Sequence, residues 1–263
     1  MIPLSVIVIA KNEEKNIGDC LQSVLWCDDI VVVDAESSDA TVALVKKFTS
    51  KIFVKPWNGF AEAKTFAVSQ AKHDWILWLD ADERVQPELA AEIQNMIASN
   101  PSYAAFAVAR RAYFLGKWIR HSGWYPGRVP RLFNKYRATF SSVPVHEGLE
   151  IDGTVGRLRH DLLHFTDPNL FHYFEKFNRY TSLAAGEAFQ EGKKFRRVDF
   201  IVRPPWLFFK MYILRLGFLD GTHGLLLAIL SSAYVFTKYA KMWEACAHAE
   251  VRSGTQARNS RPS

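Results

Sequence analysis

The sequence predicts an α/β fold built on a mostly parallel sheet, because apolar strands alternate with helical segments through the first hundred residues. Residues 5–10 and 29–34 are β-branched and apolar on both faces, as in strands that are covered on each side. Further strands are expected at 51–54 and 75–79. The helices expected between and after these strands cover residues 15–25, 41–48, 61–71 and 87–99.

The composition is that of a globular, basic and aromatic-rich chain. It has 263 residues, with 33 Lys and Arg against 27 Asp and Glu, which gives a net charge of +6. This length accommodates one large domain or a domain with an appendage, and a hydrophobic content of 49% excludes a largely disordered chain. The positive balance suits an anionic partner, such as a nucleotide, a phosphorylated glycan, a nucleic acid or an acidic membrane surface. It excludes only a purely acidic, solvating role.

The cysteines and the N-terminus indicate a reducing, cytoplasmic setting. Cys20, Cys27 and Cys246 have neither the spacing of a zinc site nor that of a disulfide framework, so no structural metal is expected from them. The apolar run at residues 4–10 is short, follows no basic residue and leads into Lys11 rather than a cleavage site. A buried strand is therefore expected there, and not a signal peptide.

Changes of pattern along the chain predict three parts. Residues 1–168 are expected to form one domain, in which 1–100 carry the regular strand and helix alternation and 101–168 carry shorter strands rich in Arg and aromatic residues. Residues 169–250 have a helical pattern and include the most hydrophobic part of the chain. Residues 251–263 are polar and basic and are expected to be disordered.

The hydrophobic region at residues 201–243 is expected to associate with a membrane. Neither of its apolar runs, 206–219 and 224–237, reaches the ~20 residues of a spanning helix, and Lys210 and Arg215 interrupt the first. Apolar, aromatic and basic residues together are typical of helices that lie in the interface of an anionic membrane. A pair of core helices is the alternative.

Acidic side chains follow the predicted strands where each one ends. Asp34 ends one strand, and Asp80 and Asp82 follow another directly. In open sheets of this kind ligands gather at the carboxyl ends of the strands. Two carboxylates separated by one residue can hold a hard divalent cation whose shell is completed by phosphate oxygens. The alternative is a solvated turn ahead of the helix that begins near Pro87.

Three segments in this order resemble the glycosyltransferase family 2 enzymes, which have the nucleotide-sugar-binding fold called GT-A. They are residues 6–14 (VIVIAKNEE), 31–41 (VVVDAESSDAT) and 78–83 (WLDADE). Other positions look like the subgroup that adds a sugar to the inner core of bacterial lipopolysaccharide. These positions are Trp57–Phe60, Lys64, Arg131–Phe133, Val145–Glu147 and His164.

The resemblance covers about residues 3–165 and implies that 1–100 bind the nucleotide sugar and 101–168 the acceptor. One departure lies at residues 61–66, which read AEAKTF where a run similar to Gln-Lys-Asn is more usual. The hydrophobic helices after residue 201 also look like those appended to some members of the family.

The resemblance assigns donor contacts to three side chains. It implies that Asp34 binds the uracil or ribose, that Asp80 lies near the ribose and the metal, and that Asp82 coordinates a Mg²⁺ or Mn²⁺ ion bridging the diphosphate. Such an ion offsets the charge that develops on the leaving nucleoside diphosphate. Lys11 or Lys64 would add positive charge at the diphosphate, with a solvated surface lysine as the alternative for each.

Inversion at the anomeric carbon needs a general base for the acceptor hydroxyl. Glu147 is the expected base, with Asp152 as the weaker alternative, and His146 would orient it or hold the acceptor. Arg131 is expected to face a phosphate of donor or acceptor.

The sequence thus predicts a metal-dependent, inverting glycosyltransferase that moves a hexose, with UDP-glucose as the expected donor, onto the heptose region of the lipopolysaccharide inner core. The expected location is the cytoplasmic face of the inner membrane, and no nucleic-acid partner is expected. One alternative keeps the fold with a polyprenyl-phosphate, capsule or protein acceptor. The other is a non-catalytic basic module that binds membranes or nucleic acid.

Overall fold

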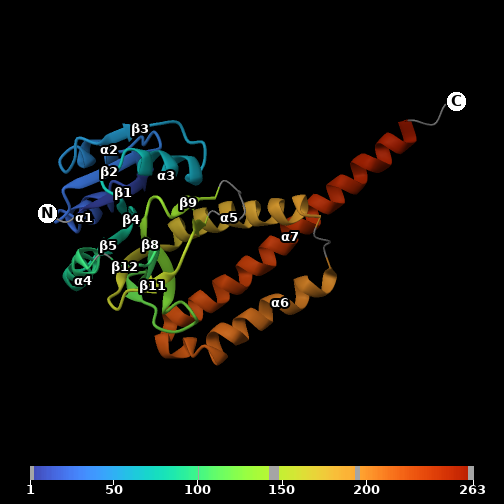
Figure 1. Ribbon diagram of the computed structural model, residues 1–263. Helices are drawn as coiled ribbons and strands as arrows, with labels where there is room; N and C mark the ends of the chain where they lie inside the picture. Colours follow the sequence, from blue (N-terminus) through green and yellow to red (C-terminus); the bar gives the residue numbers. More distant parts are fainter. Residues whose placement is uncertain (1–2, 100, 142–147, 193–195, 260–263) are drawn as a thin grey trace. The chain divides into compact units, whose positions relative to one another are not determined.

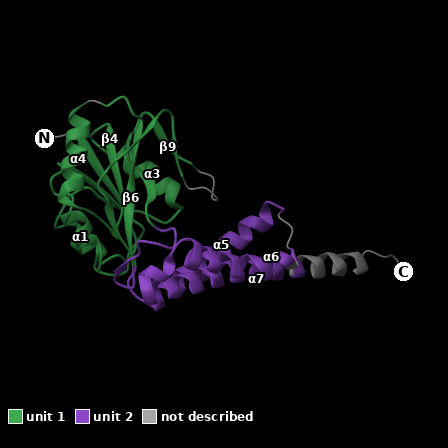
Figure 2. Ribbon diagram, turned by 90° about the horizontal axis from the view of Figure 1, so that it is seen from below, with its two compact units in different colours: residues 1–113, 125–166 green, residues 114–124, 167–263 purple. Residues whose placement is uncertain are grey.

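The computed structural model describes residues 3–99, 101–141, 148–192 and 196–259 (Figure 1). The chain forms two compact units. Unit 1 comprises residues 1–113 and 125–166, and unit 2 comprises residues 114–124 and 167–263 (Figure 2). Unit 1 contains the sheet, and unit 2 contains the long helices.

Four parallel strands form the first half of the sheet. They are β1 (Leu4–Ala10), β2 (Asp29–Asp34), β3 (Ile52–Val54) and β4 (Trp75–Asp80), and they lie in the order β3-β2-β1-β4. β1 is central to this half, with β2 and β4 paired to its two sides. The parallel arrangement expected from the alternation of strands and helices is confirmed for these strands.

The second half of the sheet is antiparallel where it meets the first. β8 (Gly127–Asn134) pairs with β4, and β6 (Ala105–Phe114) pairs with β8, both antiparallel. β12 (Leu162–Asp167) follows, with β5 (Glu83–Val85) antiparallel at the end of the order. The strands off this path are β7 (Lys117–Trp118), β9 (Ala138–Phe140), β10 (Leu149–Ile151) and β11 (Val155–Arg157).

Helices cover both faces of the parallel half (Figure 1). They are α1 (Ile17–Gln22), α2 (Thr41–Val45), α3 (Phe60–Ser69) and α4 (Pro87–Ala98). Successive β1 side chains point to opposite faces. Val6 and Val8 pack in the core that α1 and α4 cover, whereas Ile7 packs in the core that α3 covers. This two-sided burial is why the strand is apolar at nearly every position.

A buried carboxylate joins three segments at the amino ends of the strands. Asp29 is 3% exposed and accepts hydrogen bonds from Ser5 Oγ at 2.5 Å, Lys51 Nζ at 2.6 Å and the Lys72 backbone N–H at 2.8 Å. Burial opposes ionisation of this group, but the bonds from Lys51 and Ser5 outweigh it and hold the pKa of Asp29 below its usual range.

Asp29→Asn is expected to lower the free energy of unfolding by about 2 kcal/mol at neutral pH, because the charged acceptor of a buried hydrogen-bond cluster is lost. A carboxylate whose pKa is lower when folded stabilises the fold above its unfolded value of about 3.9 and loses this effect as the pH falls below it. Urea unfolding at pH 7 and pH 3 should therefore show that the difference in unfolding free energy between wild type and Asp29→Asn is smaller at pH 3. Asp19→Asn is the control, since that carboxylate is 72% exposed; equal losses in both variants would contradict the account.

Unit 2 is built from long helices. Its elements are α5 (Leu170–Gln190), α6 (Arg197–Phe209), the π-helical turn η1 (Lys210–Leu214), the 3₁₀ turn η2 (Gly217–Asp220) and α7 (Gly221–Asn259). Both α5 and α6 pack on α7. α7 and η2 are in close contact where Gly224 meets Gly217. A Cβ added to Gly224 would lie 1.9 Å from the Gly217 carbonyl oxygen, so this approach requires glycine at position 224.

The helix that contains the apolar run 224–237 is longer than this run, since α7 covers Gly221–Asn259. Among the described residues, the stretch 217–247 is long and apolar enough to cross a membrane by length and composition: its most apolar 18 residues have a mean hydropathy of 1.3, and 22% of them are buried. The expectation that neither run is long enough is corrected, because one continuous helix carries the run 224–237 together with residues on both sides of it. Length and composition alone do not separate a spanning helix from a core helix. α7 also extends to Asn259, into the segment 251–263 that was expected to be disordered.

Candidate functional site

The loops that follow β1 and β2 are bound to each other. The Asn12 N–H donates to Ser37 Oγ at 2.8 Å, and the Asn12 side chain accepts from the Ser38 N–H at 2.8 Å. The Glu13 N–H donates to Thr41 Oγ1 at 2.8 Å. Asn12 has a φ of 55°, in the left-handed region that asparagine tolerates better than most residues. These two segments therefore stabilise each other at one edge of the sheet.

Asp34 ends β2 and is fully buried. Its Oδ1 accepts the Ser37 N–H at 2.8 Å, and its Oδ2 accepts the Ser37 hydroxyl at 2.6 Å. The carboxylate thus fixes the turn after β2, a function that the sequence analysis did not foresee. Lys11, at the end of β1, is exposed.

A buried arginine organises the end of β4. Arg131 lies on β8 and is 3% exposed. Its Nη2 donates to Asp80 Oδ2 and, at 2.7 Å, to Glu83 Oε1. Glu83 is fully buried, and its other oxygen accepts the Asp80 N–H at 3.0 Å. The guanidinium carbon is 4.1 Å from the centroid of the Trp78 ring. The Arg131 guanidinium therefore contacts two carboxylates and the face of an aromatic ring.

This cluster sets the ionisation of its members. Burial opposes a charge on Asp80, but Arg131 outweighs burial and lowers the pKa of that carboxyl. Burial dominates at Glu83 and, with the repulsion of Asp80, raises the pKa of Glu83 against the attraction of Arg131. The pKa of Arg131 is raised, because the two carboxylates outweigh its burial. Asp80 is therefore held as an anion at the strand end, where 43% of its side chain is exposed.

The second carboxylate of the acidic pair has a different neighbour. Asp82 Oδ2 lies 3.4 Å from His164 Nε2, and their side chains are 15% and 17% exposed. His164 is on β12 and stands opposite Glu83 in the antiparallel register with β5. The described part of the chain contains no group of three or more His, Cys, Asp and Glu side chains able to hold a metal ion. Asp82 and His164 fit as two ligands, so further oxygens would have to come from the bound substrate.

Lys64 lies on α3 and is 6% exposed. Its Nζ is 4.0 Å from the centroid of the Trp78 ring and 5.6 Å from that of Phe140. Its charge contributes to the lowered pKa of Asp80, after the larger effect of Arg131. The alternative of a solvated surface lysine is therefore excluded for Lys64.

Glu147, the proposed general base, and His146 lie in the segment 142–147, which is outside the described residues. The strands that precede and follow that segment form a hairpin, in which Phe140 of β9 is paired with Leu149 of β10. The Phe140 ring contacts Trp78 edge-on, with 5.2 Å between centroids. Asp152, the weaker alternative, is exposed in the turn after β10. The base of the hairpin is thus next to the ring that Lys64 and Arg131 also contact.

The sequence analysis assigned no role to Trp78, Glu83 or His164. Trp78 and Glu83 lie within the WLDADE segment, so the signal was present in the residues that flank the acidic pair. Glu83 was missed because its partner Arg131 is 48 positions away. Arg131 was expected to face a phosphate, whereas the structure shows that its Nη2 faces two carboxylates.

A mixed α/β sheet with an acidic pair at the end of β4 defines a protein of the nucleotide-sugar-binding GT-A class. The chain belongs to glycosyl transferase family 2, whose family model matches residues 5–162. This membership confirms the predicted fold and makes the protein a glycosyltransferase rather than a non-catalytic module.

Several proteins are similar to this chain. The lipopolysaccharide core biosynthesis glycosyltransferase LpsC of Rhizobium meliloti is 32% identical, over 92% of this chain and 93% of LpsC. An uncharacterized glycosyltransferase of Rickettsia typhi, RT0209, is 30% identical over 93% of this chain and 88% of its own length. Among solved structures, S. aureus TarS 1–349 matches 91% of this chain and 92% of its own, with 14% identity and a TM-score of 0.47.

Arg131→Met is expected to lower the free energy of unfolding by about 3 kcal/mol, because it removes the hydrogen-bonded cation of buried Glu83 and leaves only Arg110, whose Nη1 is 3.8 Å from Glu83 Oε1. Adding Glu83→Gln to this variant should cost much less than Glu83→Gln costs alone, since the two groups are coupled. Urea unfolding of the wild type, the two single variants and the double variant measures the coupling free energy. Arg159→Met, at an exposed position, is the control; additive losses from the two buried substitutions would disprove the coupling.

Proposed function

We propose that this glycosyltransferase moves a hexose from a nucleotide sugar, with inversion and with the help of a divalent cation, onto the heptose region of a lipopolysaccharide core. The observation that carries the donor side of this proposal is the acidic end of β4, where Asp80 is held ionised by buried Arg131 while Asp82 stands beside His164. The name of LpsC supports the acceptor side.

The donor would lie at the carboxyl ends of β1, β2 and β4, where α/β sheets bind their ligands. Asp34, which is fully buried and bonded to Ser37, would take the uracil or ribose once donor binding exposes its carboxylate. Asp80 would contact the ribose through the oxygen that does not accept from Arg131. Lys11 and Lys64 would supply positive charge at the diphosphate.

The divalent cation, Mg²⁺ or Mn²⁺, would be held by Asp82 and His164, and when bound it supplies charge that offsets the developing negative charge on the leaving diphosphate. A carboxylate and a neutral imidazole both suit a Mn²⁺ ion, and a carboxylate also suits Mg²⁺. Arg131 keeps Asp80 anionic next to this pair, so the strand end stays negative and does not repel a cation.

The acceptor hydroxyl must lose a proton as the new glycosidic bond forms, and Glu147 would take it. The hairpin that flanks this residue in the chain contacts Trp78 through Phe140, which supports its assignment to the same edge of unit 1. His146 would orient the carboxylate or hold the acceptor.

We assign UDP-glucose as the donor and the cytoplasmic face of the inner membrane as the location. The second assignment draws on the apolar stretch 217–247 and on the net positive charge, because the lipopolysaccharide core is anionic and lipid-anchored. Polyprenyl-phosphate, capsule and protein acceptors are the alternatives that an acceptor panel distinguishes.

Sugar transfer from a panel of UDP-, GDP- and CDP-sugars to a detergent-solubilised lipopolysaccharide core tests this function. The wild-type protein should transfer from one UDP-sugar and lose activity in EDTA. Asp82→Asn should remove metal-dependent donor binding, measured by calorimetry with UDP and Mn²⁺. Glu147→Gln should keep donor binding and lose about 10²–10⁴-fold in kcat, the usual contribution of a general base.

The matched control is Asp19→Asn, which removes an exposed carboxylate that contacts only Arg84 among the described residues. Transfer that persists in EDTA would refute metal dependence. Full activity in Glu147→Gln would refute the base assignment and leave Asp152 to be tested. Absence of transfer to any lipid-linked core would refute the acceptor class.

A further inference from the structure

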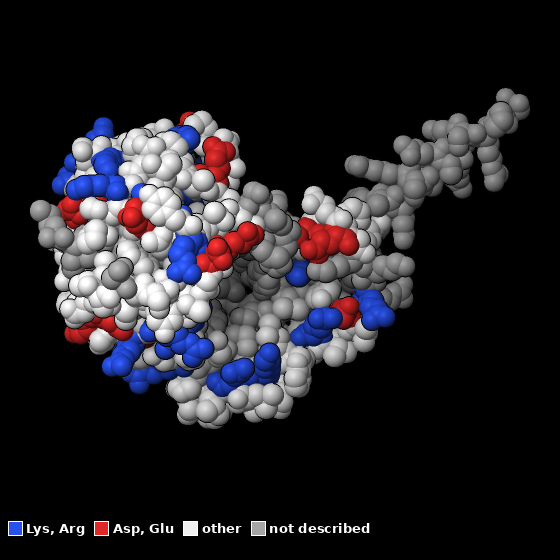
Figure 3. All heavy atoms as spheres, viewed as in Figure 1, with Lys and Arg blue, Asp and Glu red and all other residues white. Residues whose placement is uncertain are grey.

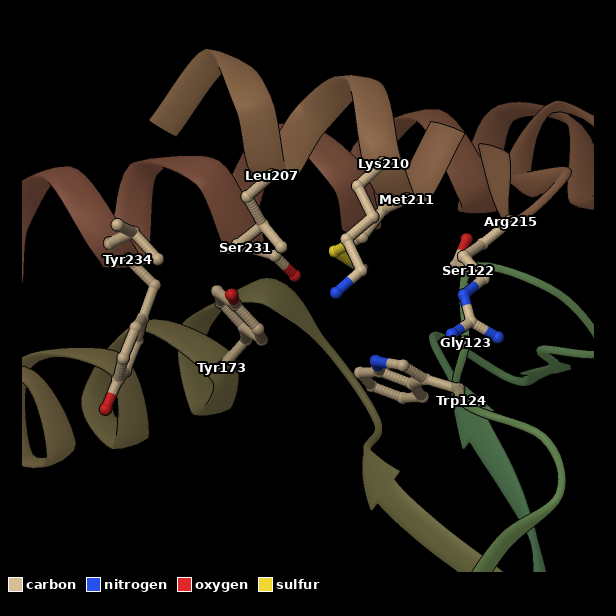
Figure 4. Close-up of a pocket in the computed structure, with 11 residues that line it drawn as sticks. Ser122, Gly123, Trp124, Tyr173, Leu207, Lys210, Met211, Arg215, Ser231 and Tyr234 are labelled. Atoms are coloured by element: carbon tan, nitrogen blue, oxygen red, sulfur yellow. The ribbon is translucent and has the colours of Figure 1, made fainter. Parts of the chain in front are cut away.

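Unit 2 contains a pocket of its own, with a volume of about 450 Å³ (Figure 4). Two cationic side chains reach it, Lys210 at the start of η1 and Arg215 just after its end. The Arg215 N–H donates to the Lys210 carbonyl at 2.8 Å, so a single turn of helix presents both. Neither residue belongs to the glycosyltransferase site described above, which lies in unit 1.

Both cations are available to a ligand. Lys210 and Arg215 are exposed, and neither forms an ion pair with any side chain in the described part of the chain. The aliphatic part of Arg215 is positioned by Gly123, where an added Cβ would lie 3.8 Å from Arg215 Cγ. Figure 4 shows Lys210 and Arg215 extending from the same helical segment toward Trp124. The two positive charges therefore flank one opening.

The wall of the pocket also offers polar groups. Ser122 is 4% exposed, and its Oγ is buried without a hydrogen-bond partner among the described residues. A buried hydroxyl of this kind costs free energy unless a ligand or water satisfies it. Burial, with a smaller effect of Asp167, raises the pKa of Tyr173 to about 12, so this phenol is neutral at pH 7 and able to donate.

The rest of the wall is apolar. Trp124, Leu207 and Met211 line the pocket and pack in the core of unit 2 with Phe114. The two exposed cations supply charge for an anion, and the apolar wall supplies contact for the non-polar part of the same ligand. The pocket therefore combines two cations, the Tyr173 phenol and an apolar wall.

The surface next to this pocket carries exposed apolar side chains on the same segment. Along α6, η1 and η2 these include Ile201 (68% exposed), Trp206 (56%), Phe209 (44%), Leu214 (55%), Phe218 (44%) and Leu219 (56%). In Figure 3 the charged side chains over α6 on the face drawn are mostly Lys and Arg, set among uncharged residues. Exposed apolar and aromatic residues interspersed with basic ones are the composition of a surface that lies in a membrane interface.

We propose that this pocket binds the phosphate group of an anionic lipid, with the phosphate between Lys210 and Arg215 and the exposed apolar side chains of α6, η1 and η2 in the surrounding lipid. This proposal rests on the membrane location assigned under the proposed function, but it concerns a second site with its own ligand. The charges of the two cations complement a phosphate, and the neutral phenol of Tyr173, which also lines the pocket, can donate to a ligand oxygen. The apolar surroundings favour a phosphate carried by lipid over one free in solution.

Vesicle co-flotation without any nucleotide sugar tests this site. The probes are phosphatidylcholine vesicles with and without phosphatidic acid, which carries a phosphomonoester. The double variant Lys210→Gln/Arg215→Gln should bind the phosphatidic acid vesicles at least about tenfold more weakly than a control that loses two charges elsewhere in unit 2. That control is Arg179→Gln/Lys238→Gln, whose parent side chains make only ring contacts among the described residues.

Equal weakening of the two double variants would overturn the proposal, because the effect would then come from surface charge in general. Inorganic phosphate alone, measured by equilibrium dialysis, should bind far more weakly than the vesicles; comparable affinity would assign the pocket to free phosphate and overturn the lipid. A change of oligomeric state in sedimentation of the pocket variant alone would make the pocket a contact between two copies and also overturn it. Thermal unfolding should be unchanged, because both replaced side chains are exposed.

A parallel assay separates this proposal from the glycosyltransferase assignment. Sugar transfer to a deacylated, water-soluble core glycan should be the same in the pocket variant and the wild type, since that acceptor carries no lipid. Absence of transfer by the wild type would refute the proposed function while the vesicle result stands. Loss of transfer to the soluble acceptor in the pocket variant would show that the pocket serves the glycan and would contradict a lipid site.

Discussion

The structure of the candidate site depends on one buried ion cluster. Arg131 comes from β8, while Asp80 and Glu83 come from the end of β4 and the start of β5. β4 and β8 are the strands where the parallel and antiparallel halves of the sheet meet, and β5 is at the end of the strand order. Removing a guanidinium from water is expensive unless charged partners replace the solvent, and here two carboxylates and the Trp78 ring do so. The same contacts that join the two halves also fix the ionisation of Asp80.

This constraint gives the two members of the acidic pair different tasks. Asp80 has a permanent cationic partner, so one of its oxygens is occupied and its orientation is set by β8. Among the described residues, the ion-pair partner of Asp82 is His164, at 3.4 Å, and the carboxylate retains capacity for another ligand. Asp34 is similar to Asp80 in that part of its hydrogen-bonding capacity serves the fold, through Ser37. The strand ends are thus rigid before any substrate arrives, as preorganised electrostatic sites require.

The sequence predicted the parallel half of the fold well and the other half poorly. β1, β2 and β4 are buried on both faces, so their β-branched runs are clear signals with bounds close to those observed. β5, β7, β9, β10 and β11 have two or three residues each, too few for a pattern to show. Their positions are decided by pairing with distant strands, which no local window contains.

The same reason explains which site residues could be found. Asp34, Asp80 and Asp82 directly follow recognisable strands, so the parallel topology places them at one edge. The role of Glu83 depends on Arg131, and that of Trp78 on Lys64 and Phe140, all from other elements. The pocket of unit 2 forms where residues 114–124 pack with the helices that follow residue 167. About forty residues separate these two segments in the chain, so hydrophobic periodicity does not reveal their association.

The most direct test of the account is the position of a metal ion in crystals of the protein grown with UDP and Mn²⁺, located by anomalous scattering. The account predicts a manganese peak within bonding distance of the Asp82 carboxylate and His164 Nε2, next to the diphosphate, with Asp80 still paired to Arg131. A peak bound by neither Asp82 nor His164, or UDP bound away from the carboxyl ends of β1, β2 and β4, would contradict it.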